Sequence, residues 1–213
     1  MDDHQRKLYN FVHDKIKDIK EINILEFGVR EGKSTRMFIE LAEKNNGNVI
    51  SIDIDDYKNL FDSKKWKFIQ SRDDNFEKIK NVLHQQQDVI LLDSFHEADH
   101  VHKIIINYYD LLKEGGYFFI DDISWLPYLK GKERDSLYCE LNNKETFDTI
   151  ICLYNDNDDK FDLEFSFISS GFAVLKKRNN LKLDLIKRYK DRKFSLRNLL
   201  RKFKNIKYFE KKN

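Results

Sequence analysis

Residues 24–35, ILEFGVREGKST, decide how this chain folds, because an apolar strand pattern runs there into two glycines and then into a helix start. The closing Gly-Lys-Ser matches the end of a nucleoside-triphosphate loop, but that loop needs four residues between its glycines. Only three separate Gly28 from Gly32. The dinucleotide motif fails as well, because it needs glycine where Arg30 stands. An acidic strand end, Glu26, followed by a tight glycine turn remains.

The composition predicts one globular domain with a substantial core. The chain has 213 residues, of which 40% are hydrophobic and 36% charged. No apolar run is long enough for a membrane span, and the polar start MDDHQRKLYN does not resemble a signal peptide. Cys139 and Cys152 form neither a disulfide framework nor a metal-ligand spacing. We therefore expect a cytoplasmic protein, with homo-oligomerisation left open.

Charge is unevenly distributed along the chain. The net charge is only +2, yet residues 176–213 hold 16 Lys and Arg against 3 Asp and Glu. We therefore divide the chain into a domain over residues 1–178 and a basic amphipathic helical tail over residues 179–213. The tail is expected either to pack on the domain or to bind an anionic membrane or acidic partner, which would make the protein membrane-peripheral. Nucleic acid is not favoured, because no base-reading module is present.

Apolar runs alternate with helical patterns through most of the chain. An opening helix is expected over residues 2–20, from the spacing of Leu8, Phe11, Val12, Ile16 and Ile19. Alternation of this kind predicts a Rossmann-like, doubly wound α/β sheet of five parallel strands. Two later strands should pair antiparallel, and residues 123–145 should be mostly irregular, with a short helix near 136–142. The expected strands are 22–27, 48–53, 66–70, 88–93, 117–121, 147–154 and 164–175; the expected internal helices are 34–45, 73–87 and one ending at Gly115-Gly116.

Carboxylates stand at the carboxyl ends of several predicted strands, where open α/β sheets bind their ligands. Any single one could merely cap the next helix, but carboxylates in such a series are hard to explain by packing. An acidic residue at Asp53 suits a ribose diol. Glu26 beside the glycine turn argues against a phosphate, because like charges repel. The series consists of Glu26, Asp53, Asp93, Asp121 and Asp122.

Over residues 20–175, Glu26-x-Gly28-x3-Gly32 and the Asp53 strand end resemble the class I S-adenosylmethionine-dependent methyltransferases. That resemblance implies that the glycine turn holds the methionine part of the cofactor and that Asp53 holds its ribose. The end of the third strand would bracket the adenine, through Ser71, Arg72 or Asp73. The implied cofactor-binding residues are therefore Glu26, Gly28, Gly32, Ser34, Asp53, Ser71, Arg72, Asp73 and Asp93.

The second half resembles the metal-dependent O-methyltransferases of the catechol type and, more closely, those that act on macrolide sugars. The pattern is Asp93-x-x-His96, followed by Asp121-Asp122. The resemblance implies that Asp93, Asp121 and Asp122 bind Mg²⁺ or Mn²⁺ and that His96 acts as general base. Hard dications prefer such oxygen ligands. The implied reaction is methyl transfer to a hydroxyl of a small molecule, sugar or glycoconjugate.

Two alternatives remain at this point. The chain could bind the cofactor without O-methyl transfer, either as a non-catalytic protein or with a nitrogen acceptor. His96-Glu97-Ala98-Asp99-His100 also matches the zinc-hydrolase motif H-E-x-x-H. That motif needs both histidines on one face of a helix, whereas His96 is predicted to precede the helix. His100 and His102 are expected to be surface residues.

Overall fold

A computed structural model describes residues 3–126 and 137–185, together with residue 196, and gives only the backbone for residues 3–5 and 8. Its centre is a seven-stranded sheet in the order β3-β2-β1-β4-β5-β7-β6. The first five strands are parallel, and β7 pairs antiparallel with β5 and β6. The predicted fold class is therefore confirmed. The strands are β1 Asn23–Phe27, β2 Asn48–Asp53, β3 Trp66–Gln70, β4 Gln87–Leu92, β5 Leu112–Ile120, β6 Phe161–Ser166 and β7 Phe172–Lys177.

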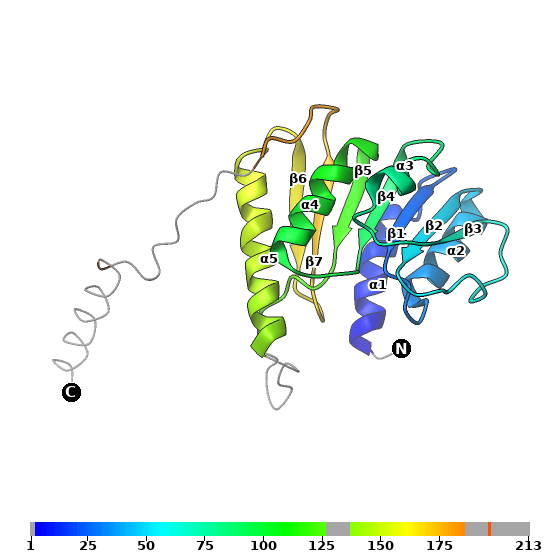
Figure 1. Cartoon of the computed structure of the whole chain (residues 1–213), viewed down its shortest axis with the longest axis horizontal. Coiled ribbons are helices and arrows are strands. Elements are labelled where there is room, and N and C mark those ends of the chain that lie inside the picture. The colour runs from blue at the N-terminus through cyan, green and yellow to red at the C-terminus, as the bar shows by residue number, and fades with distance from the viewer. Residues whose placement is uncertain (1–2, 127–136, 186–195, 197–213) are drawn as a thin grey trace.

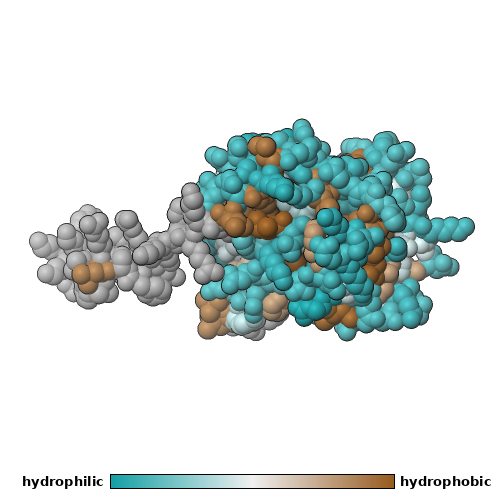
Figure 2. Space-filling view, turned by 45° about the horizontal axis from the view of Figure 1, so that its top comes forward, coloured by the Kyte–Doolittle hydropathy of each residue, from teal (hydrophilic) through white to brown (hydrophobic). Residues whose placement is uncertain are grey.

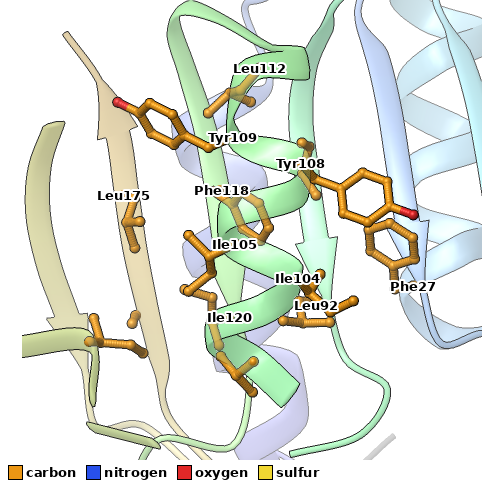
Figure 3. Close-up of a cluster of buried hydrophobic side chains, with 14 of the residues drawn as sticks. Phe27, Leu92, Ile104, Ile105, Tyr108, Tyr109, Leu112, Phe118, Ile120 and Leu175 are labelled. Atoms are coloured by element: carbon orange, nitrogen blue, oxygen red, sulfur yellow. The ribbon is translucent and has the colours of Figure 1, made fainter. Parts of the chain in front are cut away.

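Helices cover both faces of this sheet (Figure 1). One face packs against α1 (Asp3–Ile16) and α2 (Lys33–Asn45), through Val12, Ile16 and Phe38. The other face packs against α3 (Phe76–Lys80), α4 (Ala98–Tyr108) and α5 (Leu137–Asn155). Figure 3 shows how Ile104 and Ile105 of α4 meet Leu92, Phe118 and Ile120 of the sheet. Both faces of the central strands β1 and β4 are thus buried, as their continuous apolar runs require, whereas the edge strand β3 is only partly buried.

The largest error of the sequence prediction concerns residues 147–154, which form part of α5 and not a strand. Thr146, Thr149, Ile150 and Ile151 favour a strand locally, because they are β-branched. Ile150 and Leu153 are fully buried, however, and partly buried Phe147 and Tyr154 pack against the same core, which is a helical spacing. The antiparallel pair is made instead by β6 and β7, which divide the single strand predicted over 164–175.

Three boundaries also differ from the prediction. The opening helix ends at Ile16, and Asn45 bonds the carbonyls of Lys17 and Ile19 that follow it. The helix expected over 73–87 is only Phe76–Lys80, and Ile79 is the one buried residue of that short helix. Gly115-Gly116 do not end a helix: a short 3₁₀ turn, η1 (Tyr109–Leu111), leads straight into β5, where the glycines lie beside a register irregularity.

The carboxyl ends of the parallel strands meet at one edge of the sheet, the edge at which α1 begins (Figure 1). In the part of the chain that the structure describes, no helix is long and apolar enough to cross a membrane. The face in Figure 2 is largely hydrophilic, with small hydrophobic patches. The amphipathic tail predicted over 179–213 lies mostly outside the described residues, although Asp184 bonds Lys160 and Asn157 of the domain.

Candidate active site

A cavity of about 650 Å³ opens at the carboxyl ends of the parallel strands. This is the edge at which open α/β sheets bind ligands, and the volume suits a nucleoside-sized molecule. Its walls include six of the nine residues expected to bind a cofactor and two of the three expected to bind a metal. These lining residues are Gly28, Asp53, Ser71, Arg72, Asp73, Asp93 and Asp122, together with His96 and His100.

Glu26 lies beneath the glycine turn and does not line the cavity. Its fully buried carboxyl group accepts hydrogen bonds from Ser34 Oγ at 2.6 Å, Thr35 Oγ1 at 2.8 Å and Ser51 Oγ at 2.6 Å. Burial raises the pKa of Glu26 to about 7, although the three hydroxyl groups oppose that change. Glu26 and Ser34 thus tie the start of α2 to β1 and β2.

The two glycines of the turn allow close packing. A Cβ atom at Gly28, where φ is +94°, would lie only 1.8 Å from the carbonyl oxygen of Asp93. A Cβ atom at Gly32 would meet the side chains of Leu60 and Phe61, so Gly32 packs against the loop after β2 and lies off the cavity. Only glycine avoids a clash at position 28, because the ends of β1 and β4 touch there.

Asp53 holds the turn in place from the end of β2. Its Oδ2 accepts a hydrogen bond from the backbone N–H of Val29 at 2.8 Å, and its Oδ1 accepts one from Asp55 at 3.1 Å. The carboxylate also lines the cavity, so it can accept further hydrogen bonds from a ligand. Arg30, with a left-handed φ of 48°, lines the cavity beside it and was not singled out in the sequence.

The residues after β3 have different environments. Arg72 pairs with Asp74, with Nε to Oδ1 at 3.0 Å. Asp73 is largely buried and accepts hydrogen bonds through Oδ2 from Ser94 and His100. Burial opposes ionisation of Asp73, but these hydrogen bonds outweigh it and lower the pKa of the carboxyl group. The prediction that His100 is a surface residue was wrong, because only 11% of its side chain is exposed.

The acidic end of the cavity brings together the predicted metal ligands and the predicted base. His96 Nε2 lies 3.6 Å from Asp93 Oδ1 and 3.4 Å from Asp122 Oδ2. Asp121 is turned away from the cavity and accepts a hydrogen bond from Ser170 Oγ at 2.8 Å. Burial, together with the charges of Asp121 and Asp122, raises the pKa of Asp93, and burial with Asp122 raises that of Asp121 to about 7.

These carboxylates suit a hard dication in kind, because they are oxygen donors that repel one another in its absence. Their arrangement, however, does not form a full set of metal ligands. Within residues 3–126 and 137–185, no three His, Cys, Asp or Glu side chains are arranged to hold a metal ion. Asp93 and Asp122 line the cavity, whereas Asp121 does not. For both of its carboxylate oxygens to bind a metal, Asp121 would have to give up its hydrogen bond with Ser170.

The zinc-hydrolase arrangement is not formed. His96 lies on the loop before α4 and contacts Asp93 and Asp122, whereas His100 lies in the first turn of α4 and bonds Asp73. The two histidine rings therefore contact carboxylates from different strand ends. A metal held by this motif would need both rings on one helical face.

Tyr9 of α1 is a further neighbour of the site that sequence reasoning missed. Burial raises the pKa of its hydroxyl, and so do the negative charges of Asp93, Asp121 and Glu26. It precedes the buried Val12 by three residues, so both lie on the helical face that covers the sheet. The stripe of apolar residues predicted the helix but gave no sign that its tyrosine approaches the acidic cluster.

Residues 25–123 match the sequence model of a methyltransferase-domain family. Together with the strand order and the cavity at the carboxyl edge, this match decides the architecture. The chain has the class I methyltransferase fold. No curated protein matches the chain significantly. Of the residues expected to bind a cofactor or a metal, all but Glu26, Gly32, Ser34 and Asp121 line this one cavity.

Several solved structures, including methyltransferases, resemble this fold. MycE from the mycinamycin biosynthetic pathway, in complex with Mg and SAH, has a TM-score of 0.62 and 20% identity, with 80% of this chain and 49% of MycE covered. This chain thus spans about half the length of MycE. A structure assigned to a caffeoyl-CoA O-methyltransferase of Staphylococcus aureus has a TM-score of 0.61 and 20% identity, covering 83% and 84%. CmcI with Mg and SAM has a TM-score of 0.58 and 19% identity, covering 84% and 72%.

Proposed function

We propose that this protein transfers the methyl group of S-adenosylmethionine to a hydroxyl group of a small molecule, sugar or glycoconjugate, with the assistance of Mg²⁺ or Mn²⁺. The observation that carries the proposal is the layout of the cavity. Gly28 of the glycine turn and Asp53 line the same cavity as His96, which stands between two carboxylates. A bound cofactor and a reacting hydroxyl can therefore share one cavity.

The cofactor end supplies binding groups for each part of S-adenosylmethionine. The turn at Gly28 lets the ligand approach the backbone, and Asp53 accepts hydrogen bonds from the ribose. Asp73, held by His100, is the side chain after β3 best fixed to read the adenine. The surplus of carboxylates over arginines around the cavity favours a ligand that carries positive charge, as the sulfonium cofactor does.

At the acceptor end, His96 is placed to remove a proton. Its Nε2 can take the proton of an acceptor hydroxyl, and Asp93 and Asp122 stabilise the imidazolium that forms. A dication held by Asp93, Asp121 and Asp122, when bound, would supply Lewis-acid chemistry at the acceptor.

One exposed apolar side chain lines the cavity, and aromatic side chains pack together on the segments that follow β5 and β6. Phe95 lines the cavity and is 52% exposed. Phe167 packs edge-on against Trp125, with ring centroids 5.6 Å apart, and Trp125 follows Asp122 by three residues. These contacts support an acceptor that presents an apolar portion beside its hydroxyl group.

Incubation with methyl-labelled S-adenosylmethionine and a panel of sugars, glycoconjugates and phenols tests the proposal, with and without Mg²⁺. Metal-dependent label transfer to an oxygen supports it. Tight binding of S-adenosylhomocysteine without transfer to any acceptor would favour a non-catalytic protein, and transfer to nitrogen would favour an N-methyltransferase. Tight ATP binding with no response to the methionine cofactor would overturn the proposal.

A further inference from the structure

The two loops that carry the acidic end of the site both meet α5. Thr146 Oγ1 donates a hydrogen bond to the carbonyl oxygen of His96 at 3.0 Å. Asn143 Nδ2 donates one to the carbonyl oxygen of Ser124, also at 3.0 Å. Thr146 is fully buried and Asn143 is 3% exposed. Since they lie three residues apart, the same face of α5 reaches both loops.

The loop after β5 needs such support because its backbone is unusual. Asp122 has a left-handed φ of 59°, which few residues other than glycine and asparagine adopt at low cost. On one side the loop is held by the β6–β7 turn, where Ser124 N donates to the carbonyl of Ser170 at 2.8 Å. Asn143 bonds the carbonyl oxygen of the same Ser124, so the segment that follows Asp122 is held from two elements.

The loop before α4 is held from the same helix. His96 precedes the first residue of α4 by two positions, so its peptide is not stabilised by hydrogen bonds inside the helix. Thr146 bonds its carbonyl directly. His96 Nε2 and Asp122 Oδ2, 3.4 Å apart, thus belong to two loops that are each hydrogen-bonded to the same helix, one turn apart.

We propose that Thr146 and Asn143 are positioning residues that set the His96 imidazole against Asp122 and Asp93. The inference rests on the proposed function, because it assigns His96 the role of base in methyl transfer. Neither side chain lines the cavity, so neither touches the cofactor or the acceptor. A displacement of about 1 Å at a reacting group can cost about 10²-fold in rate.

Three variants of the full chain separate positioning from packing. Thr146→Val keeps the shape of the side chain but removes the donor, and Thr146→Ser keeps the donor. Thr149→Val is the matched control, because Thr149 lies on the same helix and is only half-buried. We expect Thr146→Val to lower kcat about 10–100-fold, with Thr146→Ser near wild type and Thr149→Val unchanged. The affinity for S-adenosylhomocysteine should stay within about twofold in all three, since no altered residue meets the cofactor.

A second readout does not require turnover. In ¹⁵N-histidine-labelled protein at one fixed pH, the ring resonances of His96 should move in Thr146→Val and in Asn143→Leu but not in Thr149→Val. Loss of the signal in His96→Gln assigns it. If no acceptor is methylated by the wild type, the proposed function fails, and the ring resonances still decide whether α5 positions His96.

Unchanged resonances and unchanged kcat in Thr146→Val would overturn the inference. Equal effects in Thr149→Val would overturn it as well, since they would mean that any change in α5 packing disturbs the site. Melting curves of each variant establish that the folded state is compared. If Thr146→Val does not fold, Thr146→Cys takes its place under the same criteria, because a thiol is a weak donor of similar size.

Discussion

His100 Nε2 lies 2.8 Å from Oδ2 of Asp73, so the first turn of α4 holds a carboxylate that follows β3. Ser94 donates to the same oxygen from the loop after β4. The loop after β4 and the first turn of α4 thus both bond one carboxylate oxygen of Asp73 on the cavity wall. This relationship gives His100 a different carboxylate partner from those of His96, although both histidines line the same cavity.

We expect His100→Ala to weaken binding of S-adenosylhomocysteine by about 1–2 kcal/mol, because Asp73 would lose a charge-assisted partner and its fixed orientation. Titration calorimetry measures the change. His84→Ala is the control, since His84 lines a separate pocket with Trp66 and Gln87 at the amino ends of the strands. Equal affinities for wild type and His100→Ala would mean that Asp73 does not contact the ligand.

Asp53→Ala should weaken the same binding by about 1–3 kcal/mol, through lost hydrogen bonds to the ribose and a loosened turn at Val29. Asp56→Ala should bind as the wild type does, because Asp56 is exposed and contacts Lys58. A deoxyribose analogue of the cofactor distinguishes the two causes. If the turn alone matters, Asp53→Ala will lose the same binding free energy for S-adenosylhomocysteine and for its deoxyribose analogue.

Metal binding is expected to depend on the acidic end. Removal of divalent ions by a chelator should abolish methyl transfer, and addition of Mg²⁺ should restore it. Electron paramagnetic resonance with Mn²⁺ measures binding without turnover, and Asp122→Asn should weaken it while Asp110→Asn, at an exposed position, should not. Full transfer in excess chelator would show that Asp93 and Asp122 serve the acceptor or the fold instead.

His96→Ala should lower the rate about 10²–10⁴-fold with cofactor affinity nearly unchanged, as expected for loss of a general base. The defect should shrink as pH rises, because an ionised acceptor no longer needs the base. A pH–rate profile of both proteins checks this. A constant defect at all pH values would indicate that His96 orients the acceptor only. His100→Ala should instead weaken cofactor binding, with a smaller effect on the rate at saturating cofactor.

Glu26 should make stability depend on pH. Its pKa is about 7 in the folded protein and 4.5 for an ordinary glutamate, so between these values the folded state keeps a proton that the unfolded state releases. The free energy of unfolding should therefore fall, by on the order of 3 kcal/mol, as pH rises from 4.5 to above 7. Glu26→Gln should remove this component in denaturant titrations at several pH values. Exposed Glu40→Gln should leave it intact, and a pH dependence unaltered in Glu26→Gln would refute the assignment.

The sequence predicted the parallel core because apolar runs alternate there with helical patterns, and β1, β2 and β3 lie close to where they were expected. It failed at α5, where β-branched residues favour a strand locally and only packing against α4 decides for a helix. The same difference, between features set by single strands and features set by packing, applies to the candidate site. Asp53, Asp93 and Asp122 could be found because strand ends share an edge. The contacts of His100 and Thr146 could not, because they depend on how separate elements pack.

The contact between Gly28 and the carbonyl of Asp93 has a consequence for reading mutational scans of this protein. Position 28 belongs by sequence to the turn expected to hold the cofactor, but a methyl group there would push directly on the end of β4. Gly28→Ala should therefore group with substitutions of Asp93 and His96 in its pattern of defects, and not with Asp53→Ala. The atoms that a side chain at position 28 would meet belong to the main chain, so in related sequences that keep this packing glycine would be required there whichever residue follows β4.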